Sequence, residues 1–486
     1  MTGTEKKQRP NILWLCTDQQ RYDTVACLGN PHIRTPNIDR LCAEGTAFTR
    51  TYCQSPICTP SRSSFLTGLY PSSVHGNING NLNFNLPENA QLISQHLSNL
   101  GYTCGLSGKL HLSSAWNGVE NRLDDGYQVF NYSHASTQGN ETSNQYMGWL
   151  AEIGKFDEVM DQSNRNDRLQ TGIKYRENIP FEFHQTTWCT DRALAFMRKN
   201  EIDPWFFSWN VFDPHGPFDA PADFSAPYES ADLPAPLFHE NDLELQENLS
   251  RTHVVQGKRR RPGPEAMKAK ASYYGMVELI DRNVGRLIDY LEETGQRENT
   301  VIIFTSDHGE MLGDHGLMGK GCRFYEGLTR VPLVISWPGQ VEKGLQSDAL
   351  VELLDIVPTL TEIVDEPMAW TQGKSLWPII SGQQKPDHHH DFVRCEFYDV
   401  LDMKWGKEGQ NDPPSYATMY RNDRYKLVVY HGSEYGELYD LQQDPDEFNN
   451  LWFDDAKSKV RMQLLKDSFD ASMVIVDPGS TRIGRF

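Results

Sequence analysis

The sequence predicts an α/β fold in which one large domain is followed by a smaller one. The chain has 486 residues, which is more than a single compact core usually holds. Three apolar runs of strand length, at residues 11–17, 204–211 and 300–306, each end in polar residues, as buried strands of a parallel sheet do. Closer to the C-terminus, segments 421–430 and 437–441 alternate between polar and apolar residues, which predicts an antiparallel hairpin.

Composition and charge exclude several classes of function. Hydrophobic residues make up 38% of the chain and charged residues 23%, which is ordinary for a soluble globular protein. The net charge of −20 argues against nucleic acid and against anionic membrane surfaces as partners. The nine cysteines are an odd number without dense spacing, so we expect them to be mostly reduced.

The first residues give an expectation about location. Residues 1–10 are polar, and the apolar run that follows is too short for the core of a signal peptide or for a membrane span. We therefore expect a cytoplasmic protein, or a periplasmic or secreted one if a leader has been removed.

The first predicted strand, Asn11–Thr17, leads directly into Asp18 and Gln19. In open α/β sheets, ligands bind at the carboxyl ends of the strands. A carboxylate and an amide side by side at such an end offer oxygen atoms to a hard cation, although an isolated Asp-Gln pair is more often only a turn. The next segments predict a capped helix at 35–45 and a strand at Thr46–Tyr52.

Cys58 lies in the most informative local pattern of the chain. It stands two residues before Pro60 and four before Arg62, just ahead of a predicted helix. A thiol near a helix N-terminus and beside a guanidinium is in an electropositive environment that favours anions. The pattern therefore predicts a nucleophile or an anion site, and a half-buried cysteine in an ordinary turn is the structural alternative.

The same stretch gives a prediction for local structure. Pro60 fixes its own φ and disfavours a helical Thr59, so we expect a turn at this point, before the helix. Ser61 is expected to cap that helix, which would begin near Ser63 and end at Gly68.

A second pair of candidate residues follows the strand predicted at 102–107. Lys109 and His111 are two residues apart on an extended segment, so their side chains would point the same way and face one oxyanion. An isolated pair of this kind is more often part of a solvated face. Residues 115–180 are rich in polar residues and poor in apolar runs, which predicts a surface insertion whose loops contribute to substrate selection.

His215 follows the strand predicted at 204–211 and stands between Pro214 and Pro217. A histidine held rigidly between two prolines suits a general acid, whereas an ordinary loop histidine is the alternative.

The clearest predicted strand, Thr300–Ser306, ends at Asp307 and His308. Repeated carboxylates and histidines just after a strand fit a hard-cation site better than a zinc cage, because the chain has no CxxC pairs. Asp314 and His315 are expected to lie outside the inner ligand shell.

Other segments carry structural expectations only. The basic run 258–261 lies in a stretch rich in proline and glycine and, on an acidic protein, is expected to be solvated. Residues 267–293 predict a long helix that Gly295 closes. A final helix is expected from about Asp455.

The boundary between the two domains is predicted near residues 382–391, where glycine, glutamine, lysine and proline cluster. The predicted domains are a catalytic domain at 1–385 and a smaller α+β domain at 386–486. The three histidines at 388–390 lie in this linker, and we interpret them as a chance polar tract rather than a metal site.

Several motifs together resemble those of the type I, formylglycine-dependent sulfatases of the alkaline phosphatase superfamily. Cys-Thr-Pro-Ser-Arg at 58–62 and Leu-Thr-Gly at 66–68 resemble the signature Cys-x-Pro-x-Arg…Leu-Thr-Gly. Residues 108–111 resemble the Gly-Lys-x-His motif, and residues 305–320 resemble the second metal and lysine region. The likeness covers residues 11 to about 451, and the motifs occur in the family's order.

The resemblance implies an alkaline-phosphatase-like fold, with a large, mostly parallel sheet between helices, then a small antiparallel sheet with a helix. It also implies hydrolysis of a sulfate monoester to an alcohol and inorganic sulfate. A sulfated sugar is the family's commonest substrate, which would connect this protein with the degradation of sulfated polysaccharides.

The resemblance also implies roles for individual residues. Cys58 would be oxidised to formylglycine by a formylglycine-generating or anaerobic maturation enzyme, and the hydrated aldehyde would attack sulfur. Arg62, Lys109 and Lys320 would offset the charge of the sulfate and of the transition state. In the same scheme, His215 would protonate the departing alcohol. His111 would take a proton from the second hydroxyl, which expels sulfate and regenerates the aldehyde.

The implied metal is a divalent cation, with Ca²⁺ as the expectation and Mn²⁺ or Mg²⁺ as alternatives. Asp18, Gln19, Asp307 and His308 would hold it, together with the hydrated formylglycine at position 58. Asp307 would in addition help to deprotonate that hydrate. Gln19 stands where aspartate is commoner and His308 where many members have asparagine, which resembles the choline-sulfatase and phosphonate-monoester-hydrolase branches.

Two alternative classes of function stay open. The departures at Gln19 and His308 favour a phosphonate monoester or phosphodiester hydrolase, or a choline or aryl sulfatase, on the same scaffold. A non-catalytic binding protein with a degenerate site is the second alternative. The expected partner is a sulfated saccharide or small molecule, and Arg323 and Tyr325 are candidates to meet its non-sulfate part. The sequence predicts no oligomeric state.

Overall fold

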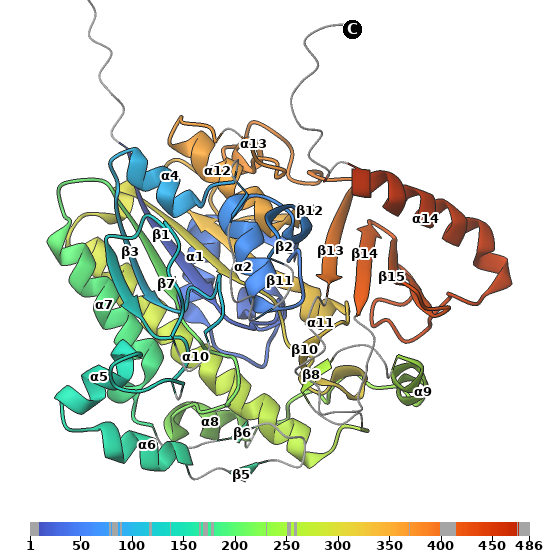
Figure 1. Ribbon diagram of the computed structural model, residues 1–486, viewed down its shortest axis with the longest axis horizontal. Coiled ribbons are helices and arrows are strands. Elements are labelled where there is room, and N and C mark those ends of the chain that lie inside the picture. Colours follow the sequence, from blue (N-terminus) through green and yellow to red (C-terminus); the bar gives the residue numbers. More distant parts are fainter. Residues whose placement is uncertain are drawn as a thin grey trace, which may run out of the picture.

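The computed structural model describes residues 9–475, apart from the short segments 77–78, 80–85, 88–89, 116–118, 137, 165–166, 169–173, 176–178, 230, 250–253, 257–259, 369, 399–414 and 474. In this part of the chain, eight strands form a large sheet and four strands form a smaller one (Figure 1). The strands of the large sheet, in spatial order, are β12 (Leu345–Glu352), β2 (Thr46–Tyr52), β11 (Arg330–Ser336), β9 (Thr300–Ser306), β1 (Asn11–Thr17), β7 (Trp205–Asn210), β3 (Thr103–Gly108) and β4 (Val129–Tyr132).

The large sheet is mostly parallel, as predicted. Strands β1, β3, β4, β7 and β9 run in one direction, and β2 runs parallel to β12. The exception is β11, which pairs antiparallel with both β9 and β2. The predicted bounds of β1, β2 and β9 are confirmed residue for residue. Strands β1 and β9 are each a continuous run that is buried on both faces, which makes their bounds clear in the sequence.

Helices cover both faces of this sheet (Figure 1). Side chains alternate along β1, so Ile12, Trp14 and Cys16 enter one hydrophobic cluster and Leu13 and Leu15 enter another. The helices that contribute to the first cluster are α2 (Cys58–Thr67), α4 (Ile93–Asn99), α12 (Ile356–Ile363) and α13 (Trp377–Ile380). Those that contribute to the second are α1 (Pro36–Glu44), α5 (Gln145–Glu152), α6 (Phe156–Asn164), α7 (Gln185–Lys199) and α10 (Pro264–Glu293).

Helix α2 begins earlier than the sequence predicts. Its first helical residue is Cys58, so the expected turn at this residue and the expected start near Ser63 are wrong. Proline is tolerated in the first turn, because the N–H it lacks would have no partner within the helix. Ser61 therefore lies inside the helix and donates its hydroxyl hydrogen to the carbonyl of Asp307 instead of capping. The predicted end at Gly68, with a left-handed φ of 73°, is confirmed.

Part of the predicted surface insertion at 115–180 belongs to the core. Strand β4 extends the large sheet, and Tyr146 and Leu150 of α5 are fully buried. This strand was not predicted, because β4 lies at the edge of the sheet and three of its four residues are only half-buried.

The smaller sheet is antiparallel, with the order β13 (Phe392–Tyr398), β14 (Tyr416–Asn422), β15 (Tyr425–Tyr430) and β16 (Gly436–Asp440). It is followed by α14 (Ser458–Met473), so the predicted hairpin and terminal helix are confirmed. Val393, Met419 and Val428 belong to the same hydrophobic cluster as Ile12 and Trp14 of the large sheet. The two sheets therefore share one continuous core, and a domain boundary at 385 stays a prediction.

Buried charges also join the two sheets. Lys426 of β15 lies 2.7 Å from Glu326 of α11 (Glu326–Thr329) and 2.8 Å from Glu447, and all three side chains are buried. Glu326 is also paired with Arg330, at 3.6 Å, and with Arg421, at 3.8 Å. The positive charges around the two carboxylates make this contact compatible with burial.

The histidine tract in the linker is not simply solvated. His388 is exposed, but His389 is buried and its Nε2 lies 3.4 Å from Asp355, which precedes α12. His390 Nε2 lies 2.9 Å from the same carboxylate. Asp355 also accepts the backbone N–H groups of Glu352 and Lys374, so the interpretation as a chance polar tract is wrong for two of the three histidines.

The remaining elements lie around the two sheets. All nine cysteines are free, as expected. Among the described residues, none of the helices combines the length and the apolar character that a membrane crossing needs. These further elements are α3 (Pro71–Val74), α8 (Ala222–Glu229), α9 (Asn241–Asn248) and the two-stranded sheets of β5 (Asp167–Arg168) with β6 (Lys174–Tyr175) and of β8 (Val254–Gln256) with β10 (Met318–Gly321).

Candidate active site

The candidate residues converge at the carboxyl edge of the large sheet. Asp18 follows β1 and Asp307 follows β9, and these two parallel strands are in register up to Thr17 and Ser306. Strands β7 and β3 run parallel to β1, and they lead to His215 and Lys109. Since parallel strands end at the same edge, residues far apart in the sequence meet in one place.

Cys58 lies at the centre of this group, at the N-terminus of α2. Its Sγ is 2.7 Å from Nζ of Lys320, 3.3 Å from Nε2 of His308, 3.4 Å from Nζ of Lys109 and 3.7 Å from Oδ1 of Asp18. Burial and the charge of Asp18 raise the pKa of the Cys58 thiol, but Lys109, Lys320 and His308 outweigh them, so its pKa lies well below the usual value. This environment stabilises a negative charge at position 58.

Arg62 fixes the two acidic residues. Its Nε donates to Asp307 at 2.8 Å, and a terminal nitrogen donates to Asp18 at 3.1 Å. The other terminal nitrogen donates to the carbonyl of Lys109 at 3.2 Å. The guanidinium is fully buried, so it orients both carboxylates and supplies positive charge beneath residue 58.

His308 is held with its Nε2 towards Cys58. Its Nδ1 lies 2.9 Å from the carbonyl oxygen of Gly309, which can only accept a hydrogen bond, so Nδ1 carries the proton. In the neutral ring, Nε2 then has the free lone pair that a metal ion needs. Asp307 is fixed in a similar way, because its Oδ1 accepts the backbone N–H groups of Gln19 and His308, each at 2.9 Å.

These side chains fit a divalent cation. Ligand atoms of Asp18, Cys58, Asp307 and His308 all lie within 4.8 Å of one another. The Oε1 atom of Gln19 is buried and finds no hydrogen-bond partner among the described residues, which is unfavourable unless another group binds it. Carboxylate, amide and imidazole donors with this charge match a hard or borderline divalent ion.

His111 borders this group in a way that the strand pattern did not predict. Its φ is 58°, so the chain turns after Lys109 and the expected extended segment is wrong. Burial and the charges of Lys109 and Arg62 hold the pKa of His111 well below its usual value, so the ring is neutral. Its Nδ1 is buried and has no hydrogen-bond partner in the described part of the chain.

His134 was missed by the sequence analysis. It follows β4, and its ring meets the ring of His111 edge to face, with 4.5 Å between the centroids. Burial together with His111 and Lys109 lowers its pKa. His134 belongs to no motif in the sequence, and it lies in the segment 115–180, for which a surface insertion is predicted.

His215 is half-buried, and its ring packs against Phe212 with 4.4 Å between the centroids. Its Nδ1 lies 2.7 Å from the carbonyl oxygen of Gly216, which leaves Nε2 available to a substrate. Burial and the charge of Lys320, partly offset by Asp18, lower the pKa of His215 to about 3. The imidazole is therefore neutral until negative charge arrives beside it.

A buried ion cluster supports the loop that carries His215. His184 lies 3.4 Å from Asp213 and 3.5 Å from Asp219, which flank His215 in the chain. Despite burial, the two carboxylates raise the pKa of His184 to about 9, so it is charged at neutral pH. The backbone carbonyl of Asp213 accepts the N–H of Asp18, which connects this loop with the predicted cation ligands.

Four further residues named in the sequence analysis lie away from the group of side chains around Cys58. Asp314 pairs with Arg21 and His315 with Asp242, so both are outside the inner shell, as expected. Arg323 and Tyr325 are buried, and both contact Gln246, so the idea that they meet the substrate is wrong. These two large polar side chains follow Lys320 closely in the sequence, but they pack in the interior of the protein and do not face the site.

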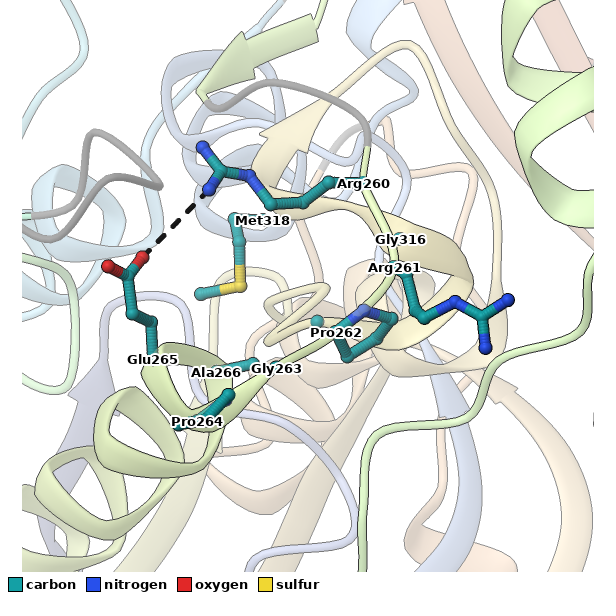
Figure 2. A pocket seen from close by; sticks show the side chains of 10 residues that line it. Arg260, Arg261, Pro262, Gly263, Pro264, Glu265, Ala266, Gly316 and Met318 are labelled. Atoms are coloured by element: carbon teal, nitrogen blue, oxygen red, sulfur yellow. Dashed lines mark ion pairs between the residues drawn. The ribbon is translucent and has the colours of Figure 1, made fainter.

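Two residues of the predicted basic run, Arg260 and Arg261, line a separate pocket (Figure 2). Lys258 and Arg259 lie outside the described residues. Arg260 and Arg261 are beside a cavity of about 360 Å³ that also touches Met318, and none of the predicted site residues lines it. Arg260 pairs with Glu265 at 4.0 Å and Arg261 with Glu240, so these two charges are compensated at the surface.

Comparison with protein families identifies two matching models. The model described as Sulfatase matches residues 10–366, and the model described as N-sulphoglucosamine sulphohydrolase, C-terminal, matches residues 313–472. Together they span both sheets.

Individual proteins are similar over nearly the whole chain. An arylsulfatase of Clostridium perfringens is 32% identical over 460 residues, which cover 91% of this chain and 90% of that protein. The multifunctional alkaline phosphatase superfamily protein PehA of Trinickia caryophylli is 31% identical over 496 residues, with 92% of each chain covered. An N-acetylglucosamine-6-O-sulfatase of Bacteroides thetaiotaomicron is 27% identical over 507 residues, which cover 96% of this chain and 87% of that protein.

The fold is also similar to a solved structure. The phosphonate monoester hydrolase of Agrobacterium radiobacter superposes with a TM-score of 0.83 and 24% identity, and 98% of each chain is covered. This likeness concerns the fold, and it confirms the architecture that the sequence predicted.

Proposed function

This chain belongs to the sulfatase family and is a sulfuric ester hydrolase, and we propose that a formylglycine made from Cys58 is its nucleophile. The observation that supports this most directly is the position of Cys58 at the start of α2, with Lys109 and Lys320 both within 3.4 Å of its sulfur. An oxygen at this position would be surrounded by the positive charge that an anionic ester needs in order to approach.

The residues of the site would have separate roles in binding the substrate and the cation. Lys109 and Lys320 would donate hydrogen bonds to the sulfate oxygens, and Arg62 would hold Asp18 and Asp307 in place. Asp18, Gln19, Asp307 and His308 would hold a divalent cation, Ca²⁺ in our proposal, with Mn²⁺ or Mg²⁺ as alternatives. When bound, such a cation supplies positive charge that activates the nucleophile and offsets charge in the transition state.

Two histidines would move the protons. As the bond between sulfur and the leaving oxygen breaks, Nε2 of His215 would give a proton to that oxygen, so that the product is a neutral alcohol. The negative charge of the bound ester would raise the pKa of His215 from its low value in the free protein. His111, neutral in the free protein, would accept the proton that is released when sulfate leaves residue 58.

The substrate that we propose is an O-sulfated saccharide. The similarity to an N-acetylglucosamine-6-O-sulfatase supports this class. An enzyme of the formylglycine-generating or anaerobic maturation type would be needed as a partner, because Cys58 itself lacks the aldehyde. Choline or aryl sulfates stay alternatives.

A second candidate is a phosphonate monoester or phosphodiester hydrolase. Gln19 in place of aspartate leaves the cation ligands with one less negative charge, and the fold is similar to a phosphonate monoester hydrolase. Preference for Mn²⁺ and faster turnover of phosphodiesters than of sulfate esters would favour this candidate.

The decisive experiment is mass spectrometry of the peptide that contains Cys58, on protein produced together with a maturation enzyme. A loss of about 18 mass units would identify formylglycine. An unmodified thiol under these conditions would contradict the proposed nucleophile. The substitution Cys58→Ala should leave a folded protein with less than about a thousandth of the wild-type turnover, and higher residual activity would equally exclude Cys58.

A further inference from the structure

Glu310 is a fully buried carboxylate at the edge of the proposed cation site. It follows His308 by two residues, and its side chain is only 1% exposed. One oxygen, Oε1, accepts the backbone N–H groups of Leu312, at 3.0 Å, and of Gly319. The other oxygen, Oε2, accepts a hydrogen bond from Nε2 of Gln19.

This contact determines which way the Gln19 amide faces. An amide has a donor end and an acceptor end, and a carboxylate can bind only the donor end. With Nε2 held by Glu310, Oε1 must point away from Glu310. In this orientation, Oε1 of Gln19 is buried and has no hydrogen-bond partner among the described residues.

We propose that Glu310 is a positioning residue that turns the carbonyl oxygen of Gln19 towards the cation. The inference rests on the proposed cation site and explains why an amide occupies position 19. A carboxylate at that position would face the carboxylate of Glu310, and both groups are buried, so the repulsion would be strong.

The arrangement predicts what each single substitution does. In Glu310→Gln, the backbone N–H groups of Leu312 and Gly319 would keep the amide oxygen, so the new NH₂ group would face residue 19. Gln19 would then have to offer its oxygen to that NH₂ group and would no longer offer it to the cation. In Gln19→Glu, two carboxylates would meet.

The double substitution should restore the contact with its polarity reversed. In Gln19→Glu with Glu310→Gln, the NH₂ group at position 310 would donate to one oxygen of the new carboxylate at position 19. The other oxygen of that carboxylate would remain for the cation. Reciprocal rescue of this kind is not expected from a residue that only fills space.

The test measures cation affinity directly. The full-length protein and its variants are stripped with a chelator and titrated separately with Ca²⁺, Mn²⁺ and Mg²⁺ by calorimetry. Each single variant should bind the cation about tenfold or more weakly than wild type, and the double variant should return to within about threefold of it. The matched control is Glu437→Gln, which changes another buried glutamate, in β16, and should leave the affinity unchanged.

Each outcome separates the inference from the proposed function. If wild type binds the cation and Glu310→Gln binds it equally well, the positioning role is wrong while the cation site stands. If wild type binds neither Ca²⁺, Mn²⁺ nor Mg²⁺, both are wrong. Thermal melts in excess chelator show whether a variant is folded without cation.

If Glu310→Gln does not fold, the cation affinity of Gln19→Ala is compared with that of the double variant Gln19→Ala with Glu310→Asp. In a Gln19→Ala background no amide is left to orient, so adding Glu310→Asp should not weaken cation binding further. Additional weakening there would overturn the inference, because Glu310 would then act by another route.

Discussion

Positive charge is concentrated around Cys58 in a protein whose net charge is −20. Lys109, Lys320 and Arg62 are buried beside Cys58, and the carboxylates paired with them in the described part of the chain are those of Asp18 and Asp307. The local excess would be larger with a divalent cation bound. An anionic ester is therefore attracted by the site itself and not by the surface of the protein.

His215 allows a prediction about the leaving group. His215→Ala should lower kcat/KM for alkyl or sugar sulfates by roughly 10²–10⁴, because these alcohols leave poorly without a proton. An aryl sulfate with an acidic phenol needs little protonation and should be much less affected. The measurement is kcat/KM for both classes with wild type and variant. Equal losses for the two substrates would show that His215 is not the general acid.

The sequence predicted most of the central residues because each stands in a short motif at the end of a recognisable strand. Glu310 and His134 could not be found in this way. Glu310 acquires its meaning from Gln19, which is 291 positions away in the chain, and His134 from its contact with His111. Contacts of this kind depend on the exact positions of side chains from distant segments, which local patterns in a single sequence do not reveal.

At the level of elements, long apolar runs were predicted well and short or edge elements poorly. The bounds of β1 and β9 follow from complete burial, and α10 follows from its long amphipathic pattern. Helix α2 was misplaced by the rule that the residue before a proline avoids the helical conformation, because Thr59 is helical here, in the first turn. Strand β4 was missed because a half-exposed edge strand lacks an apolar pattern.

The loop that follows β9 approaches α11 closely, and this close approach requires glycine at position 309. A Cβ atom on Gly309 would lie 2.0 Å from the carbonyl oxygen of Gly327, so Gly309→Ala must push the two segments apart. We expect it to lower the free energy of unfolding by about 1–3 kcal/mol and to reduce activity, because His308 precedes it and Glu310 follows it.

Chemical denaturation and steady-state kinetics measure these two effects. Gly263→Ala is the matched control, since a Cβ there meets no atom within 4 Å, and its effect should stay within about 1 kcal/mol. Equal stability of the two variants would contradict the close approach at Gly309.

In the whole molecule, the linker between the two sheets is held by an ion pair that depends on pH. Asp355 raises the pKa of His390 to about 9 from its usual 6.5 despite burial, and Glu352, His389 and Lys374 are the other titratable groups around it. Because the folded-state pKa is the higher one, this stabilisation is complete below pH 6.5 and is lost as the pH rises through 9.

Wild type should therefore lose more unfolding free energy between pH 6.5 and pH 9 than His390→Gln, by roughly 1–3 kcal/mol. Urea denaturation at a series of pH values measures the difference. The exposed neighbour His388 provides the control, because His388→Gln should follow wild type. Parallel curves for wild type and His390→Gln would show that the pair does not contribute.

The buried contact of Lys426 with Glu326 and Glu447 has a consequence for how such chains can be recombined. A gene fusion that exchanges residues 386–486 for the matching segment of a homologue would remove Lys426 and leave Glu326 behind in the recipient. In the recipient, Glu326 would keep Arg330, at 3.6 Å, but would lose Lys426 and Arg421. Unless the donor brings a cation to the same place, the buried carboxylate is compensated less well and the hybrid folds poorly. Hybrid libraries should therefore tolerate new surface loops more readily than a foreign C-terminal sheet, and the two sheets should be inherited together.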